Sequence, residues 1–354
     1  MNEKRLVTKD FFASANTYYG FRSYFSDIFN SRSFDRIYVL KGGPGTGKST
    51  LLKRIGKEAL KSNAALERFV CSSDLGSLDG VIIERENKRV ALLDGTAPHE
   101  RDAVIAGAVD VLVNLGEGID INRIRERKDE IVELNDKKSH AYKKAYEKLQ
   151  KSSIFYTNIK AEISNIFDYR ACITACERAF DMLSPTGTST RGTRLLSSFS
   201  KGGRAFLNST AQAVSHRIGV RGIYGSECIF LNMLSELLSE KGIPYVKIVS
   251  PLDPTVTEGI YFTDDDTMIV ADNTDGADLD TAELLPINKK SAFFDEIKAL
   301  EVGMKLYEEA SRLAFEEASK YHFELENIYG SAVDFSVIDA KCEYLMESIS
   351  KIFS

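Results

Sequence analysis

A glycine-rich segment constrains this chain more than any other feature of its 354 residues. Residues 42–50 read Gly-Gly-Pro-Gly-Thr-Gly-Lys-Ser-Thr, which fits a glycine, four residues and then Gly-Lys-Ser. An apolar, β-prone run (37–40) precedes it and a helix-favouring run (51–60) follows it. Glycines let backbone N–H groups turn inward toward an anion, and the positive end of the following helix points at the same place. The segment therefore predicts a strand, a phosphate-binding loop and a helix.

The chemistry of this loop assigns a role to each part of the motif. We expect Lys48 to reach the β- and γ-phosphates of ATP, and the Ser49 hydroxyl to hold Mg²⁺. The residues expected to contact the nucleoside triphosphate are Gly43, Pro44, Gly45, Thr46, Gly47, Lys48, Ser49 and Thr50.

A second expected metal ligand lies 46 residues after Lys48. Val90-Ala91-Leu92-Leu93 is an apolar run that ends in Asp94, the pattern of the strand that supports Mg²⁺ in P-loop proteins. A carboxylate at the carboxyl end of that strand lies beside the phosphates. Gly95 follows Asp94, so the glutamate that activates water in many ATPases is missing from its usual position.

Two further residues are candidates for catalysis. Asp74 follows a strand expected at residues 67–72, where P-loop kinases carry a substrate or base carboxylate; its alternative role is that of a turn residue in Ser72-Ser73-Asp74-Leu75-Gly76. His99, just beyond the metal strand, is the histidine placed to sense the γ-phosphate, and its alternative role is loop packing.

The chain also repeats itself with a spacing of about 180 residues. Lys41 to Lys48 aligns with Arg221 to Cys228, and the segments at 70–74, 79–83 and 90–96 align with those at 248–253, 258–262 and 268–274. Upstream, residues 14–20 resemble residues 197–203. In this register Glu227-Cys228-Ile229 replaces Gly47-Lys48-Ser49, so the second loop lacks the lysine and should repel phosphate.

Each half ends in a long stretch with helical periodicity. Apolar residues of the first recur every three, four or seven positions, and its register matches residues 162–168 with 324–330. Asp168 and Gly330 mark the expected turns of two helical hairpins. We expect a first half at 1–186 (core 10–118, hairpin 119–184) and a degenerate half at 187–354 (core 187–290, hairpin 291–354). The halves would meet near residues 185–188, and the hairpins either pack on their own domains or bind a partner or a second copy.

Composition bounds the class of protein. The chain is 43% hydrophobic and 28% charged, with a net charge of −6, which gives no reason to expect nucleic acid or an anionic membrane as partner. No segment is apolar enough for a membrane span or a signal peptide. Five scattered cysteines indicate reduced thiols and a cytoplasmic location; Cys172 and Cys176 suit buried packing on one helix face.

Taken with the loop, the segments Cys-Ser-Ser-Asp (71–74), Ser-Leu-Asp-Gly-Val-Ile-Ile (77–83) and Leu-Leu-Asp-Gly-Thr-Ala-Pro-His (92–99) resemble a family of bacterial two-halved P-loop ATPases of uncharacterised function. The resemblance spans nearly the whole chain and is strongest over residues 38–114. It implies a P-loop NTPase fold and ATP, and it implies no substrate. In that family the second half usually carries a P-loop as well, and this chain departs there.

These observations predict an α/β fold with a mainly parallel sheet and a helical hairpin in each half. The first functional hypothesis is an Mg²⁺-dependent ATPase that couples hydrolysis to conformational change, with Lys48 stabilising the transferred charge. The alternatives are a small-molecule kinase and a nucleotide-gated scaffold with little turnover. Arg204, Arg217 and Arg221 lie before or on the second loop, and we weigh an arginine finger against a surface role for them.

Overall fold

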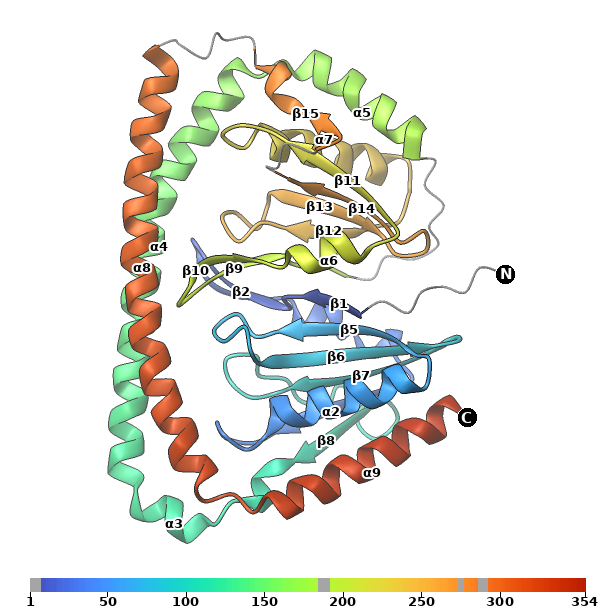
Figure 1. Cartoon of the computed structure of the whole chain (residues 1–354), viewed down its shortest axis with the longest axis vertical. Helices are drawn as coiled ribbons and strands as arrows, with labels where there is room; N and C mark the ends of the chain where they lie inside the picture. The colour runs from blue at the N-terminus through green and yellow to red at the C-terminus, as the bar shows by residue number, and fades with distance from the viewer. Residues whose placement is uncertain (1–7, 184–191, 273–276, 286–291) are drawn as a thin grey trace.

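The computed structural model describes residues 8–183, 192–272, 277–285 and 292–354. Two β-sheets lie one above the other, and two long helices run along one side of both (Figure 1). The expected α/β class is confirmed. The expected junction at residues 185–188 lies outside the described residues.

The first sheet has six strands in the order β1-β5-β6-β7-β4-β8. Their bounds are β1 (Thr8–Phe11), β4 (Arg36–Lys41), β5 (Ala65–Val70), β6 (Leu78–Arg85), β7 (Lys88–Asp94) and β8 (Asp110–Asn114). The β1–β5, β7–β4 and β4–β8 pairs are parallel, whereas β6 is antiparallel to both of its neighbours. The sheet is therefore mixed, with β6 and β7 forming a hairpin.

The second sheet repeats the order of the last five strands of the first, and among the described residues no strand of this sheet takes the place of β1. It runs β12-β13-β14-β11-β15, with the same relative directions as β5-β6-β7-β4-β8. Its strands are β11 (His216–Arg221), β12 (Val246–Val249), β13 (Thr257–Phe262), β14 (Thr267–Ala271) and β15 (Leu279–Asp280). Two small hairpins also correspond: β2 (Ser14–Thr17) with β3 (Gly20–Ser23), and β9 (Ser197–Ser200) with β10 (Gly203–Phe206). The five strands of the second sheet follow the order of β5-β6-β7-β4-β8, in agreement with the aligned segments of the sequence repeat.

Apolar side chains from both sheets meet in a shared core. Phe69 and Leu93 of the first sheet belong to the same buried cluster as Ile248 and Val270 of the second. The outer faces are covered by α2 (Lys48–Lys61) on the first sheet and α7 (Ser226–Glu240) on the second. The short elements are α1 (Phe25–Ile28), η1 (Ser31–Ser33), η2 (Leu115–Gly118), α6 (Asn208–Ala213) and η3 (Thr281–Leu284).

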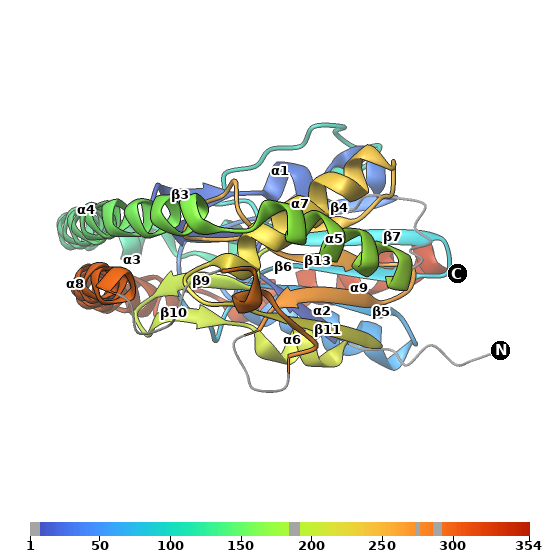
Figure 2. The same ribbon diagram turned by 90° about the horizontal axis from the view of Figure 1, so that it is seen from above.

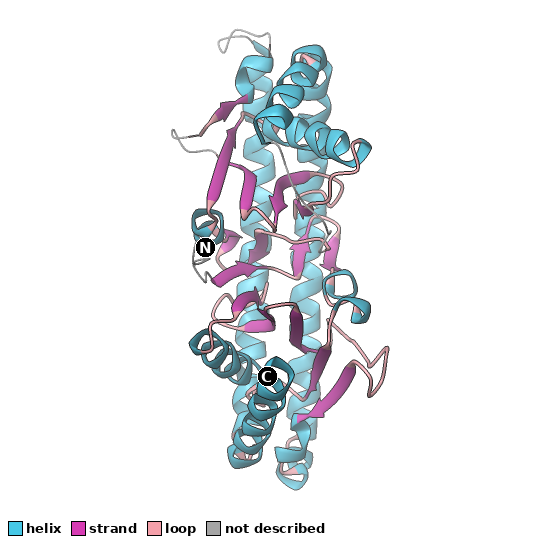
Figure 3. Ribbon diagram, turned by 90° about the vertical axis from the view of Figure 1, so that its right-hand side faces the viewer, coloured by secondary structure: helices cyan, strands magenta, loops and turns pink. Residues whose placement is uncertain are grey.

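The long helices form an antiparallel pair. Helix α4 (Lys128–Ile166) and helix α8 (Ala292–Gly330) have 39 residues each, about 58 Å at 1.5 Å per residue. Ile131 near the start of α4 packs against Ile328 near the end of α8. The pair stands to one side of the sheets (Figure 2) and extends past both of them (Figure 3). A break at Arg127 separates α4 from α3 (Ile121–Glu126). No helix within the described ranges has both the length and the apolar character needed to cross a bilayer.

The short arms of the two hairpins pack on opposite sheets. Helix α5 (Tyr169–Leu183) buries Cys172 and Cys176 in the core of the second sheet. Helix α9 (Phe335–Phe353) buries Ile338 and Leu345 in the core of the first, against α2. The structure thus differs from the alternative in which each hairpin packs on its own domain, because α4 and α8 each span both sheets and deliver the next helix to the other sheet (Figure 1).

Candidate functional site

The glycine-rich loop joins the carboxyl end of β4 to the start of α2, as the sequence predicts. Gly45 has φ +69° and Gly47, the residue before the helix, has φ +84°, a left-handed conformation that glycine adopts without strain. The Thr46 hydroxyl donates a 2.8 Å hydrogen bond to the Gly43 carbonyl and so ties the loop to itself. The backbone needed for an anion-binding loop is present.

Lys48 lies at the mouth of this loop with Asp94 beside it. Its ammonium donates to the carbonyl oxygens of Gly42 and Gly43, at 2.8 Å each, and lies 3.6 Å from the Asp94 carboxylate. Strand β7 pairs in parallel with β4, with Asp94 in register with Leu40. The two carboxyl ends therefore meet at one sheet edge, which is why an Asp so distant in sequence is adjacent to the lysine.

The oxygens expected to hold Mg²⁺ are a hydroxyl and a carboxylate, which suits this cation because it retains waters and phosphate oxygens for its remaining ligands. Ser49 Oγ accepts a 2.9 Å hydrogen bond from the Leu78 backbone N–H, and Asp94 accepts from the backbone N–H and hydroxyl of Thr96. Thr96 thus orients the carboxylate. Within the described residues no cluster of three or more His, Cys, Asp or Glu side chains could hold a metal ion.

Asp74 lies on the loop between β5 and β6. Its carboxylate accepts a 2.8 Å hydrogen bond from the Ser77 hydroxyl and a longer one from the Gly76 N–H, so it acts as a turn residue. Its side chain is nevertheless 47% exposed and 3.9 Å from the ammonium of Lys201, which belongs to the β9–β10 turn of the second segment. The second segment therefore reaches this loop through a lysine that the sequence did not indicate.

His99 is placed by loop packing. Its ring is buried, stacks on Phe25 at 4.6 Å between centroids and lies near Phe21, while its Nε2 is 3.3 Å from the Asp79 carboxylate. These contacts favour the alternative role of loop packing over sensing of the γ-phosphate, since aromatic rings and Asp79 enclose the imidazole.

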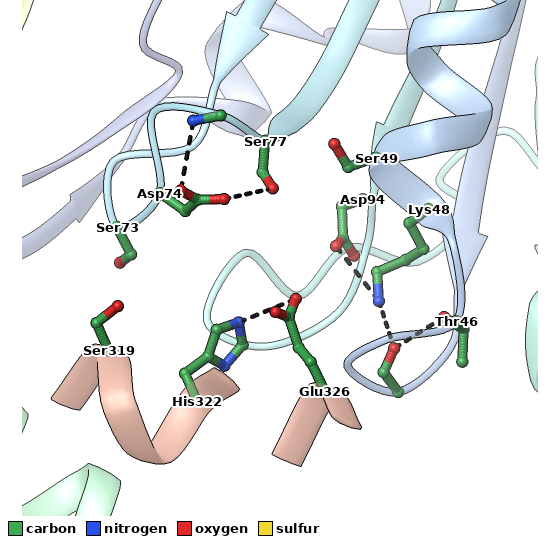
Figure 4. Close-up of polar contacts among 12 residues, drawn as sticks. Thr46, Lys48, Ser49, Ser73, Asp74, Ser77, Asp94, Ser319, His322 and Glu326 are labelled. Atoms are coloured by element: carbon green, nitrogen blue, oxygen red, sulfur yellow. Dashed lines mark hydrogen bonds and ion pairs between the residues drawn. The ribbon is translucent and has the colours of Figure 1, made fainter. Parts of the chain in front are cut away.

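Helix α8 brings two titratable side chains that the sequence did not single out. His322 and Glu326 project from α8 toward the space between the Asp74 loop and Lys48 (Figure 4), and their Nε2 and Oε1 atoms are 3.6 Å apart. The helix meets the glycine loop directly, because a Cβ atom on Gly45 would overlap the Glu326 carbonyl oxygen. The Tyr329 ring would lie 3.3 Å from a Cβ atom on Gly43.

These two side chains have shifted pKa values. Burial raises the pKa of the Glu326 carboxyl, and the charge of Asp74 adds to that, while Lys48 and Lys201 act against it. Burial lowers the pKa of His322, with Lys138 and Lys48 acting in the same direction. His322 is therefore neutral near pH 7, and its contact with Glu326 is not an ion pair there.

The second loop, between β11 and α7, is shorter than the first, and a side chain lies inside it. Helix α7 begins at Ser226 after Gly225 (φ +90°), so Ser226 takes the place that Lys48 has in α2; Glu227 follows it, and Cys228 lies beyond both. The second loop is therefore two residues shorter than the first, whereas the sequence register gave the two loops equal length. The Ser226 hydroxyl accepts from the Ile223 N–H and contacts Thr281 Oγ1 at 3.0 Å, so a side chain occupies the inside of this loop.

The three arginines near the second loop form ion pairs within their own segment. Arg204 pairs with Glu258, Arg217 with Asp272, and Arg221 with Asp280. The pairing favours a structural role over an arginine finger.

No family model, curated protein or solved structure matches the chain.

Proposed function

We propose that the chain is a P-loop nucleoside triphosphatase that binds ATP with Mg²⁺ and couples hydrolysis to conformational change. The observation that carries the proposal is the placement of Lys48 at the start of α2, 3.6 Å from Asp94 at the end of the neighbouring parallel strand. The loop glycines of positive φ, Gly45 and Gly47, support it, because they allow the N–H groups to converge on phosphate.

In this proposal Lys48 stabilises the charge of the transferred phosphoryl group. Ser49 and Asp94 would hold Mg²⁺, which neutralises phosphate charge when bound. The contact of α8 with Gly45 and Gly43 supports the coupling, because a change in the loop reaches a helix that spans both sheets.

We further propose that the two segments are homologous halves of which one keeps a nucleotide site. The matching strand order and the corresponding hairpins β2–β3 and β9–β10 support descent from one unit. The shorter, filled second loop supports a single site.

The test is ATP binding by calorimetry and phosphate release by the purified chain, each with and without Mg²⁺. Lys48→Ala should lower turnover at least about a hundredfold, whereas Lys57→Ala, an exposed lysine of the same helix, should leave it unchanged. Wild-type turnover in Lys48→Ala would refute the proposal.

A small-molecule kinase is the second candidate, favoured by the exposed carboxylate of Asp74 near Lys201. Labelled ATP incubated with a metabolite mixture separates the two functions. Label that appears only as free phosphate supports the ATPase, and label on a metabolite supports the kinase.

A further inference from the structure

The position after Asp94, where many ATPases carry the base for the attacking water, has no acid. The residue after Asp94 is Gly95, and the nearby His99 is enclosed by Phe25 and Asp79. Asp74 is held in a turn by the Ser77 hydroxyl. Figure 4 shows a further carboxylate, that of Glu326 on α8, directed toward the side on which Lys48 lies.

Glu326 is held at the loop by its own backbone. Its carbonyl oxygen lies so close to Gly45 that a side chain at position 45 would displace the helix. Figure 4 shows the carboxylate on the side of the helix that faces Lys48, and the charge of Lys48 lowers its pKa against the effect of burial. The side chain is still 43% exposed, so water reaches it.

The other half of the chain supplies an internal comparison. In the register that matches residues 162–168 with 324–330, Glu326 corresponds to Ser164 and His322 to Lys160. Lys160 forms a 2.9 Å ion pair with Asp253, the counterpart of Asp74, so α4 approaches the loop between β12 and β13. At the position that Glu326 has in α8, which contacts the loop that keeps its lysine, α4 has a serine.

A carboxylate in this place weakens nucleotide binding by charge repulsion, which a neutral side chain that only packed against the loop would not do. A nucleoside triphosphate bound at Lys48 brings several negative charges toward Glu326, and like charges repel. Burial and Asp74 already raise the pKa of this carboxyl, which makes it a stronger proton acceptor than a solvated glutamate.

We propose that Glu326, delivered by α8, is the general base for ATP hydrolysis, with His322 as its positioning residue. The inference rests on the proposed function. Water oxygen bonds to the γ-phosphorus while the bond from that phosphorus to the β,γ-bridging oxygen breaks, and its electron pair leaves with ADP. The water proton passes to the Glu326 carboxylate and then to solvent, so ATP and water give ADP, phosphate and a proton.

The test is steady-state hydrolysis and ATP affinity for Glu326→Gln, with Glu324→Gln, an exposed glutamate of the same helix, as the matched control. Glu326→Gln should lower kcat about a hundredfold or more and leave the Kd for ATP unchanged or lower. Glu324→Gln should behave as wild type. Glu326→Asp, which keeps an acid on a shorter stem, should recover part of the loss.

The pH profile separates a base from a structural contact. Wild-type kcat should fall as the pH drops through the pKa of the base, since a protonated carboxyl accepts no proton, and Glu326→Gln should lose this acidic limb. His322→Asn should move the limb without removing it. An unchanged kcat or an unchanged limb in Glu326→Gln would overturn the assignment while the ATPase stands. A wild-type chain that binds ATP without hydrolysing it would overturn both.

Discussion

The carboxylate of Glu227 lies against the backbone of Gly222, so closely that a Cβ atom at position 222 would overlap its Oε2 atom. In the first loop the corresponding neighbour of Gly42 is the Thr46 hydroxyl, 2.7 Å from such a Cβ atom. The second loop therefore holds a carboxyl group of its own where a phosphate would approach. This relationship explains in physical terms why the two loops differ in chemistry as well as in length.

The first prediction concerns stoichiometry. Calorimetric titration with ATP should give one site per chain, lost in Lys48→Ala and unaffected by Cys228→Ala, because the second loop contains a carboxylate and no lysine. Two sites per chain, or loss of binding in Cys228→Ala, would show that the second loop binds nucleotide.

Glu227 also leads to a prediction about pH and stability. Burial raises the pKa of this carboxyl, and its Oε2 has no hydrogen-bond partner among the described residues. For an acid whose folded pKa lies above its unfolded value, stability is fully present below the unfolded pKa and declines as the pH rises through the folded one.

Glu227→Gln should therefore stabilise the chain relative to wild type at pH 8, by about 1 kcal/mol or more, and by less at pH 5. Denaturant unfolding at the two pH values measures this difference. Glu236→Gln, an exposed position on the same helix, is the control and should show no such pH dependence. An equal effect at both pH values would mean that Glu227 is not the titrating group.

Arg204 is predicted to act on stability and not on turnover. Its partner Glu258 has a side chain only 4% exposed, and removing one member of a buried pair leaves the other charge uncompensated. Arg204→Ala should cost about 3 kcal/mol of unfolding free energy and leave kcat for ATP unchanged. The double variant Arg204→Met/Glu258→Gln should recover much of the loss. A hundredfold fall in kcat with intact stability would instead identify an arginine finger.

The sequence was sufficient where the chemistry is local. Residues 42–50 predicted the loop and its helix, and the run before Asp94 predicted a strand that ends beside them, because both follow from glycine conformation and strand periodicity. The repeat predicted the order of the second sheet. It also indicated a loop without lysine, although the backbone places Ser226, not Cys228, at the start of α7.

The apolar periodicity of the sequence could not predict that α5 and α9 each pack on the sheet of the other half. Both helices have an apolar stripe, and a stripe shows which face of a helix is buried without showing which sheet buries it. Since the two cores share an architecture, either would accept either helix. The crossing of α8 brings Glu326 to Gly45, and the β9–β10 turn brings Lys201 to Asp74, so these site residues on distant elements could not be read from sequence spacing.

The exchange itself gives the last prediction. Leu345 of α9 is fully buried in the first core beside Cys342, whereas the neighbouring Tyr344 is 62% exposed. Leu345→Ala should lower the unfolding free energy by about 3 kcal/mol, and Tyr344→Ala should change it by less than about 0.5 kcal/mol. Because Leu345 packs with Leu52 of α2, hydrogen exchange in Leu345→Ala should rise in β4 and α2 and stay low in β11 and α7. Faster exchange in β11 and α7 with protection kept in α2 would mean that α9 packs on its own half and that the hairpins are not exchanged.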